Sequence, residues 1–213
     1  MGEIHSELYL ANSWHLLCDR EIAELAERGM ITPFVSRQVR QNNDSVSCME
    51  RILSYGLGPC GYDVRLGTSF KGDHKDTTIL DPKQPPAQHY CFDATEGVVV
   101  APGTMLSGVT VETFTMPNDV QGLCIGKSSY TRIGLLTQFT GIEPGFRGTL
   151  TVQMFNVTPH HIYVYPGEGI LQVLFWRCPA PTRPYAGYFQ GQRGVVVGVD
   201  DNGLREEEHD GRE

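Results

Sequence analysis

Most of the chain alternates short apolar segments with turn residues, which is the pattern of a β protein. The apolar segments are rich in Val, Ile, Leu and aromatic residues, and each is bounded by Gly, Pro or Asn. They cover residues 62–66, 97–100, 104–114, 121–125, 148–156, 161–165, 169–176 and 194–199. Short strands at close spacing, separated by turn residues, predict a β-sandwich or a β-barrel.

Helical periodicity is confined to two places. Residues 19–29 place apolar side chains at i, i+3 and i+4 from Ile22, so the pattern predicts a helix there. Asp19 is the predicted N-cap, and Gly29 is predicted to end the helix at the C′ position. A short helical turn is predicted inside 127–133.

Length and local composition suggest one domain with tails. The chain has 213 residues, which fits one main domain at 16–199 after an N-terminal extension at 1–15. Residues 200–213 contain seven acidic residues against two arginines, and this composition predicts a disordered acidic tail. Residues 36–60 and 68–95 are polar and carry few strand signals, so they are predicted to be loops or short insertions.

Charge and composition narrow the possible partners. The formal net charge of −8 argues against non-specific binding to nucleic acid. No apolar run approaches the ~18 residues of a membrane span, and the N-terminus has no secretory pattern. The six cysteines are scattered without metal-ligand spacing, which indicates free thiols in a reducing cytoplasm and no zinc site.

The segment at 148–156 separates its residues clearly between two faces. Because side chains alternate along a strand, Leu150, Val152 and Met154 are predicted to face the core. The opposite face carries polar groups and an aromatic ring: Thr149, Thr151, Gln153 and Phe155. Such a face suits a pocket wall, a solvent-exposed surface or a subunit interface, and the sequence leaves these open.

Three further segments are candidates for binding. In GKSSYTRIGL (126–135), backbone N–H groups, two serine hydroxyls and Arg132 are suited to surround phosphate oxygens, although an ordinary capped turn has the same composition. In TGIEPGFRGTL (140–150), Glu143 lies at a tight turn that leads into the segment at 148–156. GYFQGQRG (187–194) has the composition of a mobile flap that closes over a ligand.

Taken in order, these segments resemble the dCTP deaminase family of the trimeric dUTPase superfamily. The resemblance rests on LLCDREIAELAERGMITP, YDVRLG, GKSSYTRIGL, GIEPGFRGTLTVQMFN, YPGEGILQVLF and YFQGQRG, and it extends over roughly 16–200. It implies a mainly β subunit, a distorted jelly-roll-like β-barrel with a short N-terminal helix. It also implies a homotrimer with active sites between subunits. The implied substrates are pyrimidine deoxynucleoside triphosphates that bring Mg²⁺ on the triphosphate, without zinc.

The resemblance also assigns roles to residues. Ser128 and Ser129 match the phosphate-binding serines, Arg132 matches an active-site arginine, and Gln192 matches a flap glutamine that reaches the phosphates. The implied substrate-binding residues are Lys127, Ser128, Ser129, Arg132, Glu143, Gln153, Tyr188, Phe189 and Gln192. Four of them form the implied catalytic group: Ser128, Arg132, Glu143 and Gln153.

The departures from the family pattern fall in this site. Gln153 stands where the family has the glutamate that activates water and transfers protons, and an amide cannot act as a general base. Glu143 stands where the family usually has an aspartate. The loop between Arg132 and Glu143 is slightly shorter than usual, and Tyr188 replaces a lysine in the flap.

Three functions therefore remain open. The first is a dCTP deaminase in which another carboxylate replaces the missing base, Glu143 being the nearest candidate and Glu168 a more remote one. The second is a diphosphatase that cleaves dUTP or a modified pyrimidine nucleotide, with Glu143 orienting the water. The third is a non-catalytic nucleotide-binding trimer.

Overall fold

The structure is a computed structural model that describes residues 14–41, 51–73, 89–137 and 140–197. The predicted acidic tail at 200–213, and the predicted N-terminal extension apart from its last two residues, lie outside the described residues. None of the helices in the described residues is long and apolar enough to cross a membrane. Within the same ranges, Cys18, Cys60, Cys91, Cys124 and Cys178 are free thiols.

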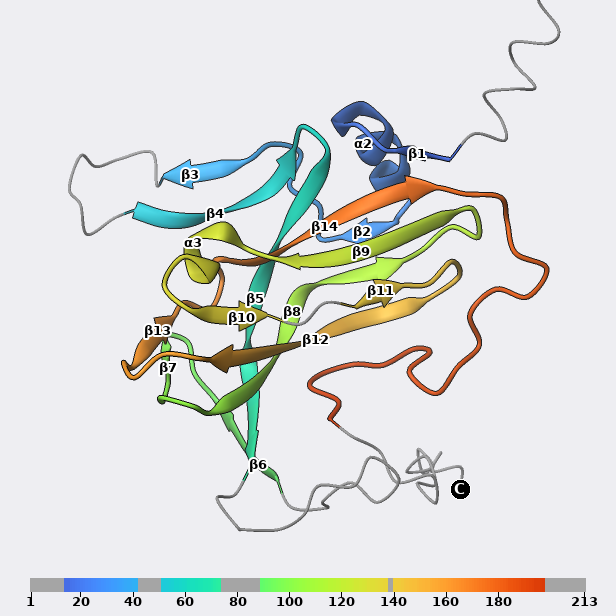
Figure 1. Cartoon of the computed structure of the whole chain (residues 1–213). Helices are drawn as coiled ribbons and strands as arrows, with labels where there is room; N and C mark the ends of the chain where they lie inside the picture. Colours follow the sequence, from blue (N-terminus) through green and yellow to red (C-terminus); the bar gives the residue numbers. More distant parts are fainter. Residues whose placement is uncertain (1–13, 42–50, 74–88, 138–139, 198–213) are drawn as a thin grey trace, which may run out of the picture.

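Strands dominate the molecule, which confirms the mainly β prediction (Figure 1). The strands of the described residues are β1 (His15–Leu16), β2 (Ile31–Thr32), β3 (Val39–Gln41), β4 (Arg51–Gly58), β5 (Gly61–Asp73), β6 (His89–Asp93), β7 (Val98–Val100), β8 (Met105–Thr115), β9 (Val120–Gly126), β10 (Leu135–Thr137), β11 (Gly141–Ile142), β12 (Arg147–Asn156), β13 (Ile162–Val164) and β14 (Gly169–Arg177). The helices are α2 (Asp19–Glu27) and α3 (Ser128–Thr131).

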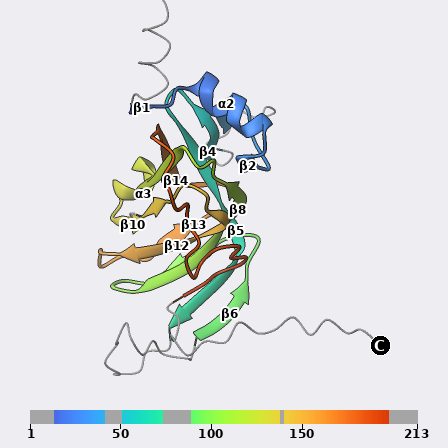
Figure 2. The ribbon, with the colours of Figure 1, turned by 90° about the vertical axis from the view of Figure 1, so that its right-hand side faces the viewer.

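The main sheet is curled so that its two ends approach each other. Its strand order is β10-β12-β8-β5-β14-β9-β11, with antiparallel pairing, and β7 and β13 form a separate two-stranded sheet. β10 ends at Thr137 and β11 begins at Gly141, so the first and last strands of this order are close neighbours along the chain. Figure 2 shows the strands wrapping around a common interior rather than lying flat. This arrangement confirms the predicted barrel-like fold.

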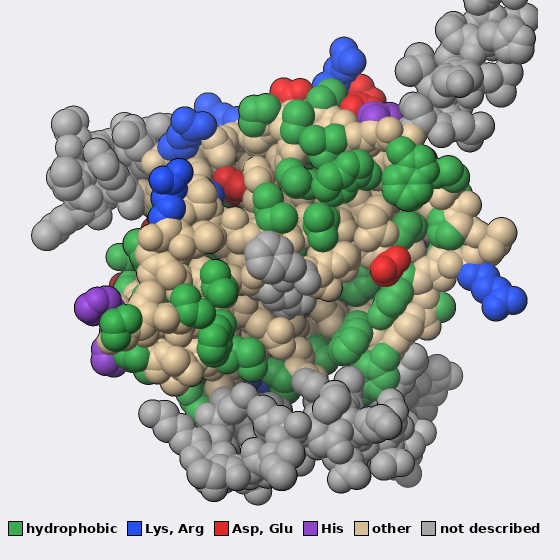
Figure 3. All heavy atoms as spheres, in the orientation of Figure 1, with side chains coloured by type: hydrophobic (Ala, Val, Ile, Leu, Met, Phe, Trp, Pro, Cys, Tyr) green, Lys and Arg blue, Asp and Glu red, His purple; other side chains and the backbone are tan. Residues whose placement is uncertain are grey.

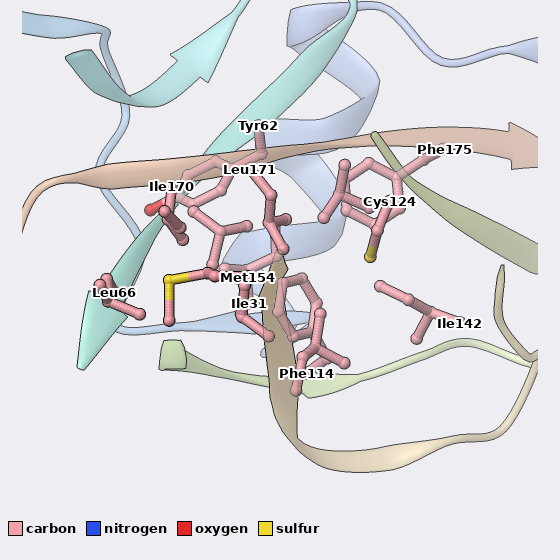
Figure 4. Packing of buried hydrophobic residues seen from close by; sticks show 14 of the residues in the cluster. Ile31, Tyr62, Leu66, Phe114, Cys124, Ile142, Met154, Ile170, Leu171 and Phe175 are labelled. Carbon is pink, nitrogen blue, oxygen red and sulfur yellow. The ribbon is translucent and has the colours of Figure 1, made fainter. Parts of the chain in front are cut away.

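The interior of the curled sheet is filled by apolar side chains from many strands (Figure 4). Tyr62, Phe114, Phe175 and Met154 are fully buried there, and they come from β5, β8, β14 and β12. Burial of such side chains stabilises the fold by about 1.5–3 kcal/mol each relative to exposure. The core therefore fixes the positions of the strands that carry the candidate site.

The helix prediction for 19–29 is confirmed, but its N-cap is one residue earlier than predicted. Cys18 is the N-cap, and its backbone N–H donates to Glu21 Oε2 over 3.1 Å, an interaction of the capping-box type. Asp19 is instead the first helical residue. Gly29 follows the C-cap with a φ of 92°, as predicted for the C′ position. The short turn predicted inside 127–133 is α3.

The prediction that 36–60 and 68–95 are loops is wrong over much of their length. They contain β3, β4, the second half of β5, and β6. The strands form because backbone partners are available: β5 pairs with β4, β6 and β8 along its length. Glycine, which is depleted in strands, recurs in β4 and β5, where these hydrogen bonds decide the structure.

The strand predicted at 194–199 is also not formed in its described part. Residues 194–197 have no strand pairing, and 198–199 lie outside the described residues. The Val196 N–H donates to the Thr151 hydroxyl over 3.0 Å instead of to a strand carbonyl. This segment is therefore joined to β12 by a hydrogen bond to a side chain rather than by strand pairing.

Candidate functional site

A tight turn presents Glu143 to solvent just before β12. The Phe146 N–H donates to the Glu143 carbonyl over 3.0 Å, and Gly145 has a φ of +85°. Pro144 precedes Gly145, and this order of residues is typical of a type II turn. The predicted acidic turn is therefore confirmed, and it holds an exposed Glu143 beside the first residues of the strand.

β12 has the two faces that the sequence predicts. Leu150, Val152 and Met154 are buried in the core. The outward-facing side chains are half-buried or exposed, and they are Thr149, Thr151, Gln153 and Phe155. Gln153 pairs in register with Ser107 of β8, so it lies in the interior of the sheet and not at its edge.

A pocket of about 560 Å³ lies over this outward face. Glu143, Gln153, Phe189 and Gln192 all line it, together with Tyr185 and other residues. The structure thus brings together four of the residues predicted from the sequence. They come from three places in the chain: the turn before β12, the middle of β12 and the C-terminal flap. Glu168, the more remote carboxylate, does not line this pocket. Its Oε2 accepts the Leu53 N–H over 2.6 Å.

The flap follows its own β12 closely. Gln192 forms a parallel bridge with Gly148. The Thr149 N–H donates to the Gln192 carbonyl over 3.1 Å, and Gln192 Nε2 donates to the Thr149 carbonyl over 2.6 Å. The Gln192 amide nitrogen is therefore engaged with the strand in this single chain. Tyr188 is exposed and contacts Phe189 edge to face.

Gln190 holds the flap in place, and sequence reasoning did not single it out. Its Oε1 accepts the Arg147 N–H over 2.7 Å, and its Nε2 donates to the carbonyls of Gly145 and Tyr185 over 2.9 and 3.0 Å. One side chain thus joins the flap to the Glu143 turn and to the start of β12. No sequence signal distinguishes it, because its partners are all backbone groups.

The serine motif lies on α3 and the residues around it. Ser128, Ser129 and Arg132 are exposed. Within the described residues, the Arg132 guanidinium has no hydrogen-bond or ion-pair partner. Tyr130 is buried between them, and its hydroxyl accepts the Tyr165 N–H over 3.1 Å. Burial raises the pKa of Tyr130, so this hydroxyl stays protonated.

Lys127 points inward, unlike the serines that follow it. Its Nζ lies 2.8 Å from Asp63 Oδ2 and donates to Ser54 Oγ over 3.0 Å. The side chain of Lys127 is 8% exposed. Of the predicted substrate-binding residues in the serine motif, Lys127 is thus the one whose side chain is already bound within the fold.

The serine motif and the Glu143 pocket remain separate in one chain. The pocket lining contains none of the residues 127–132, and Ser129 instead lines a different pocket of about 410 Å³ beside β13. In Figure 1, α3 and β11 lie on opposite sides of the molecule's front face. The residues predicted to bind phosphate and those predicted to act on the base are therefore not assembled within a single chain.

The described residues contain no group of three or more His, Cys, Asp or Glu side chains placed to hold a metal ion. A protein-held divalent cation normally uses several such ligands.

Comparison with known proteins gives a consistent result. A family model described as dCTP deaminase-like matches residues 16–178. The dCTP deaminase of Bordetella petrii is 38% identical over 184 residues, covering 84% of this chain and 96% of the relative. The dCTP deaminase of Pseudomonas fluorescens is 36% identical over 185 residues, with the same shares covered.

The fold is also found among solved structures. The 2'-deoxycytidine 5'-triphosphate deaminase of Agrobacterium tumefaciens superposes with a TM-score of 0.56 and 18% sequence identity. The match covers 78% of this chain and 49% of the Agrobacterium chain, so this chain spans about half the length of that protein.

Proposed function

The chain belongs to the dCTP deaminase-like family, and on this premise we propose that it hydrolyses dCTP to dUTP and ammonia. It aligns over 84% of its length with curated relatives that carry this name, and it covers 96% of theirs. The substrate is thus a pyrimidine deoxynucleoside triphosphate. Free thiols are in keeping with a cytoplasmic enzyme.

The observation that carries the proposal is the shared pocket of Glu143 and Gln153. Glu143 takes a proton from a water molecule, whose oxygen attacks C4 of cytosine, and delivers that proton to N3. It then moves the second proton of the former water to the amino nitrogen at C4. The bond from C4 to this nitrogen breaks, ammonia leaves and C4 becomes a carbonyl. Glu143 is the only carboxylate among the described residues that line this pocket, so the role falls to it.

Gln153 serves to bind the base rather than to transfer protons. Its amide has both a donor and an acceptor, so it can pair with the exocyclic amino group and N3 of cytosine. It cannot transfer protons between the water and the nucleobase, because an amide has no basic group of suitable pKa. The division of roles leaves Glu143 as the single proton carrier of the pocket.

Phosphate binding completes the site from a neighbouring copy. Ser128, Ser129 and Arg132 are exposed, yet they do not line the Glu143 pocket of their own chain. A homotrimer in which each α3 reaches the pocket of the next subunit would bring the two groups together. Mg²⁺ enters with the substrate, held by its phosphate oxygens.

The surface supports such an assembly. Leu136, Phe155 and Met105 are paired in register across β10, β12 and β8, and each is at least 40% exposed. Hydrophobic side chains also gather over β14 and β9 on the face shown in Figure 3. Exposed apolar rows on sheet faces mark interaction sites, and this face carries both halves of the proposed site.

The test of the proposal is the Glu143→Gln variant assayed with Mg²⁺ and dCTP. We expect wild-type protein to release ammonia and form dUTP, and the variant to lose about 10²-fold or more in kcat because its general base is gone. The measurement is ammonia release together with separation of nucleotides by anion exchange. Wild-type turnover with an unaffected variant would exclude Glu143 as the base.

A second candidate function is favoured by the amide at position 153. A diphosphatase needs a carboxylate that orients water towards a phosphate. It also needs a residue that recognises the nucleobase, and position 153 does not have to supply a general base. Glu143 and Gln153 satisfy these needs in one pocket. The same assay separates the two functions, because a diphosphatase yields a nucleoside monophosphate and pyrophosphate instead of ammonia. Nucleotide binding without either product would leave a non-catalytic binding trimer.

A further inference from the structure

The start of the serine motif is anchored in the interior by a buried polar cluster. Lys127 Nζ contacts Asp63 Oδ2 at 2.8 Å and Ser54 Oγ at 3.0 Å. The same carboxylate oxygen accepts Gln38 Nε2 over 2.9 Å. The cluster thus joins the residue before α3 to β4, to β5 and to the residue preceding β3.

The backbone of Lys127 controls the turn that carries the serines. Its carbonyl accepts the N–H groups of Tyr130 and Thr131, both over 3.0 Å, and the Thr131 hydroxyl over 3.1 Å. Lys127 is also the N-cap of α3. Its position therefore sets the position of Ser128 and Ser129, which follow it directly.

The packing leaves little freedom for the lysine side chain. A Cβ at Gly169 would come within 3.0 Å of the Lys127 Cε and would also clash with the Ser54 backbone. The side chains of Lys127 and Asp63 are 8% and 6% exposed. Withdrawing the ammonium to reach a phosphate would leave the Asp63 carboxylate buried without its cationic partner, which is strongly unfavourable.

We propose that Lys127 does not bind the substrate phosphates but is a positioning residue, whose buried ion pair with Asp63 holds Ser128 and Ser129 in place to bind them. This inference rests on the proposed nucleotide-binding role of the serine motif. Its consequence is that the positive charge offered to the triphosphate by this motif comes from Arg132 alone.

The test uses Asp63→Asn, which removes the anchor without touching a group that could reach a phosphate. We expect Asp63→Asn and Lys127→Met each to raise the Kd and the KM for Mg²⁺-dCTP about tenfold or more, because the displaced serines lose about one charge-assisted hydrogen bond to the phosphates. The kcat should stay within about threefold of wild type, since the proton carrier is elsewhere. The double variant should bind no worse than Lys127→Met, because both changes break the same pair.

Opposite outcomes identify the alternatives. If Lys127→Met weakens binding while Asp63→Asn binds as well as wild type or better, Lys127 contacts the phosphates directly and the inference is wrong. Wild-type Kd and KM in both variants would reduce the pair to a structural role and would equally overturn it. Arg20→Met, at an exposed position of α2 that lines neither pocket, is the control and should bind as wild type.

Folding and function are separated by two further measurements. Thermal unfolding identifies any variant that does not fold. If Lys127→Met does not fold, the binding measurements are made on Asp63→Asn and Ser54→Ala. Calorimetric titration with Mg²⁺-dCTP measures Kd without turnover. Absence of ammonia from wild-type protein would therefore contradict the proposed deamination, whereas an unchanged Kd in Asp63→Asn would contradict only the present inference.

Discussion

At the scale of single residues, position 153 limits the chemistry of the pocket. Gln153 lies in the interior of the sheet, held in register with Ser107, so a glutamate there would occupy almost the same place. We expect Gln153→Glu to raise the kcat for dCTP by about 10-fold to 10²-fold, because a second carboxylate shares the transfer of protons.

The measurement is ammonia release at saturating dCTP, with Gln153→Leu as the control. The leucine variant should lose dCTP affinity, because it can neither donate to the base nor accept from it. A Gln153→Glu variant that releases less ammonia than wild type would show that the amide is needed in the deamination itself.

Glu168 provides a prediction on pH and stability. Burial raises the pKa of this carboxyl group, and the hydrogen bond from the Leu53 N–H opposes the increase without cancelling it. A raised folded-state pKa contributes stability below the unfolded pKa, and that contribution is lost as pH rises through the folded pKa. We therefore expect the free energy of unfolding of wild type, relative to Glu168→Gln, to fall as pH rises from about 4 to 7.

Urea unfolding of both proteins across this pH range measures the difference. The glutamine keeps an acceptor for the Leu53 N–H, so the comparison isolates the ionisation of the carboxyl group. A difference that is constant with pH, or one that grows in favour of wild type, would contradict the assignment.

Single residues of the site differ in how far the sequence predicts their positions. The outward face of β12 was predictable, since side chains alternate along any strand and Leu150, Val152 and Met154 are apolar. The Glu143 turn was predictable from Pro144 and Gly145. The inward direction of Lys127 was not, because its partner Asp63 is 64 positions away in sequence and a lysine in a polar segment usually faces solvent.

At the scale of elements, the flap depends on one glutamine. Gln190 bonds to the backbone of Arg147, Gly145 and Tyr185, and the Gly191 N–H donates to the Arg147 carbonyl over 2.7 Å. We expect Gln190→Ala to speed hydrogen exchange at the amides of Gly191 and Arg147, and to raise the KM for dCTP by about tenfold, because these interactions no longer hold the flap over the pocket.

Hydrogen exchange by mass spectrometry and steady-state kinetics test this prediction together. Arg193→Gln is the control, since its side chain is exposed on the same flap and has no partner within the described residues. Unchanged exchange in Gln190→Ala would mean that the contacts of Gly191 and Gln192 with β12 are enough to hold the flap.

Elements with strong apolar patterns were predicted well, and those defined by their partners were not. β8 and β12 alternate apolar and polar residues and β14 is largely apolar, and their predicted bounds agree with the structure within a residue. The second half of β5 consists of Gly, Thr, Ser, Lys and Asp around a single Phe70, and it becomes a strand because β6 and β8 supply hydrogen bonds on both sides. No local pattern reports such a distant partner.

At the scale of the whole molecule, the fold keeps the two groups of predicted site residues apart within one chain. The curled sheet places α3 and the Glu143 turn at different positions along its surface, and each group is exposed. Leu136, Phe155 and Met105 form an exposed apolar row across three neighbouring strands. A second copy of the chain could cover this row. The sequence implied this division only through its resemblance to a trimeric family, since no periodicity encodes a contact between subunits.

Mixing two inactive variants tests the proposed sharing of sites. Arg132→Ala removes the phosphate-binding group, and Glu143→Gln removes the base, so each pure protein should be nearly inactive. In a ring of three, every mixed trimer contains one interface at which an intact Arg132 meets an intact Glu143. Purification through both tags keeps only mixed trimers, each with one working site of three, so the purified protein should recover about a third of wild-type activity. The two proteins are co-expressed with different tags, purified through both, and assayed with dCTP beside wild type of the same trimeric mass.

If both groups act within one chain, no combination of these variants makes a working site, and the doubly tagged trimers should remain as inactive as their parents.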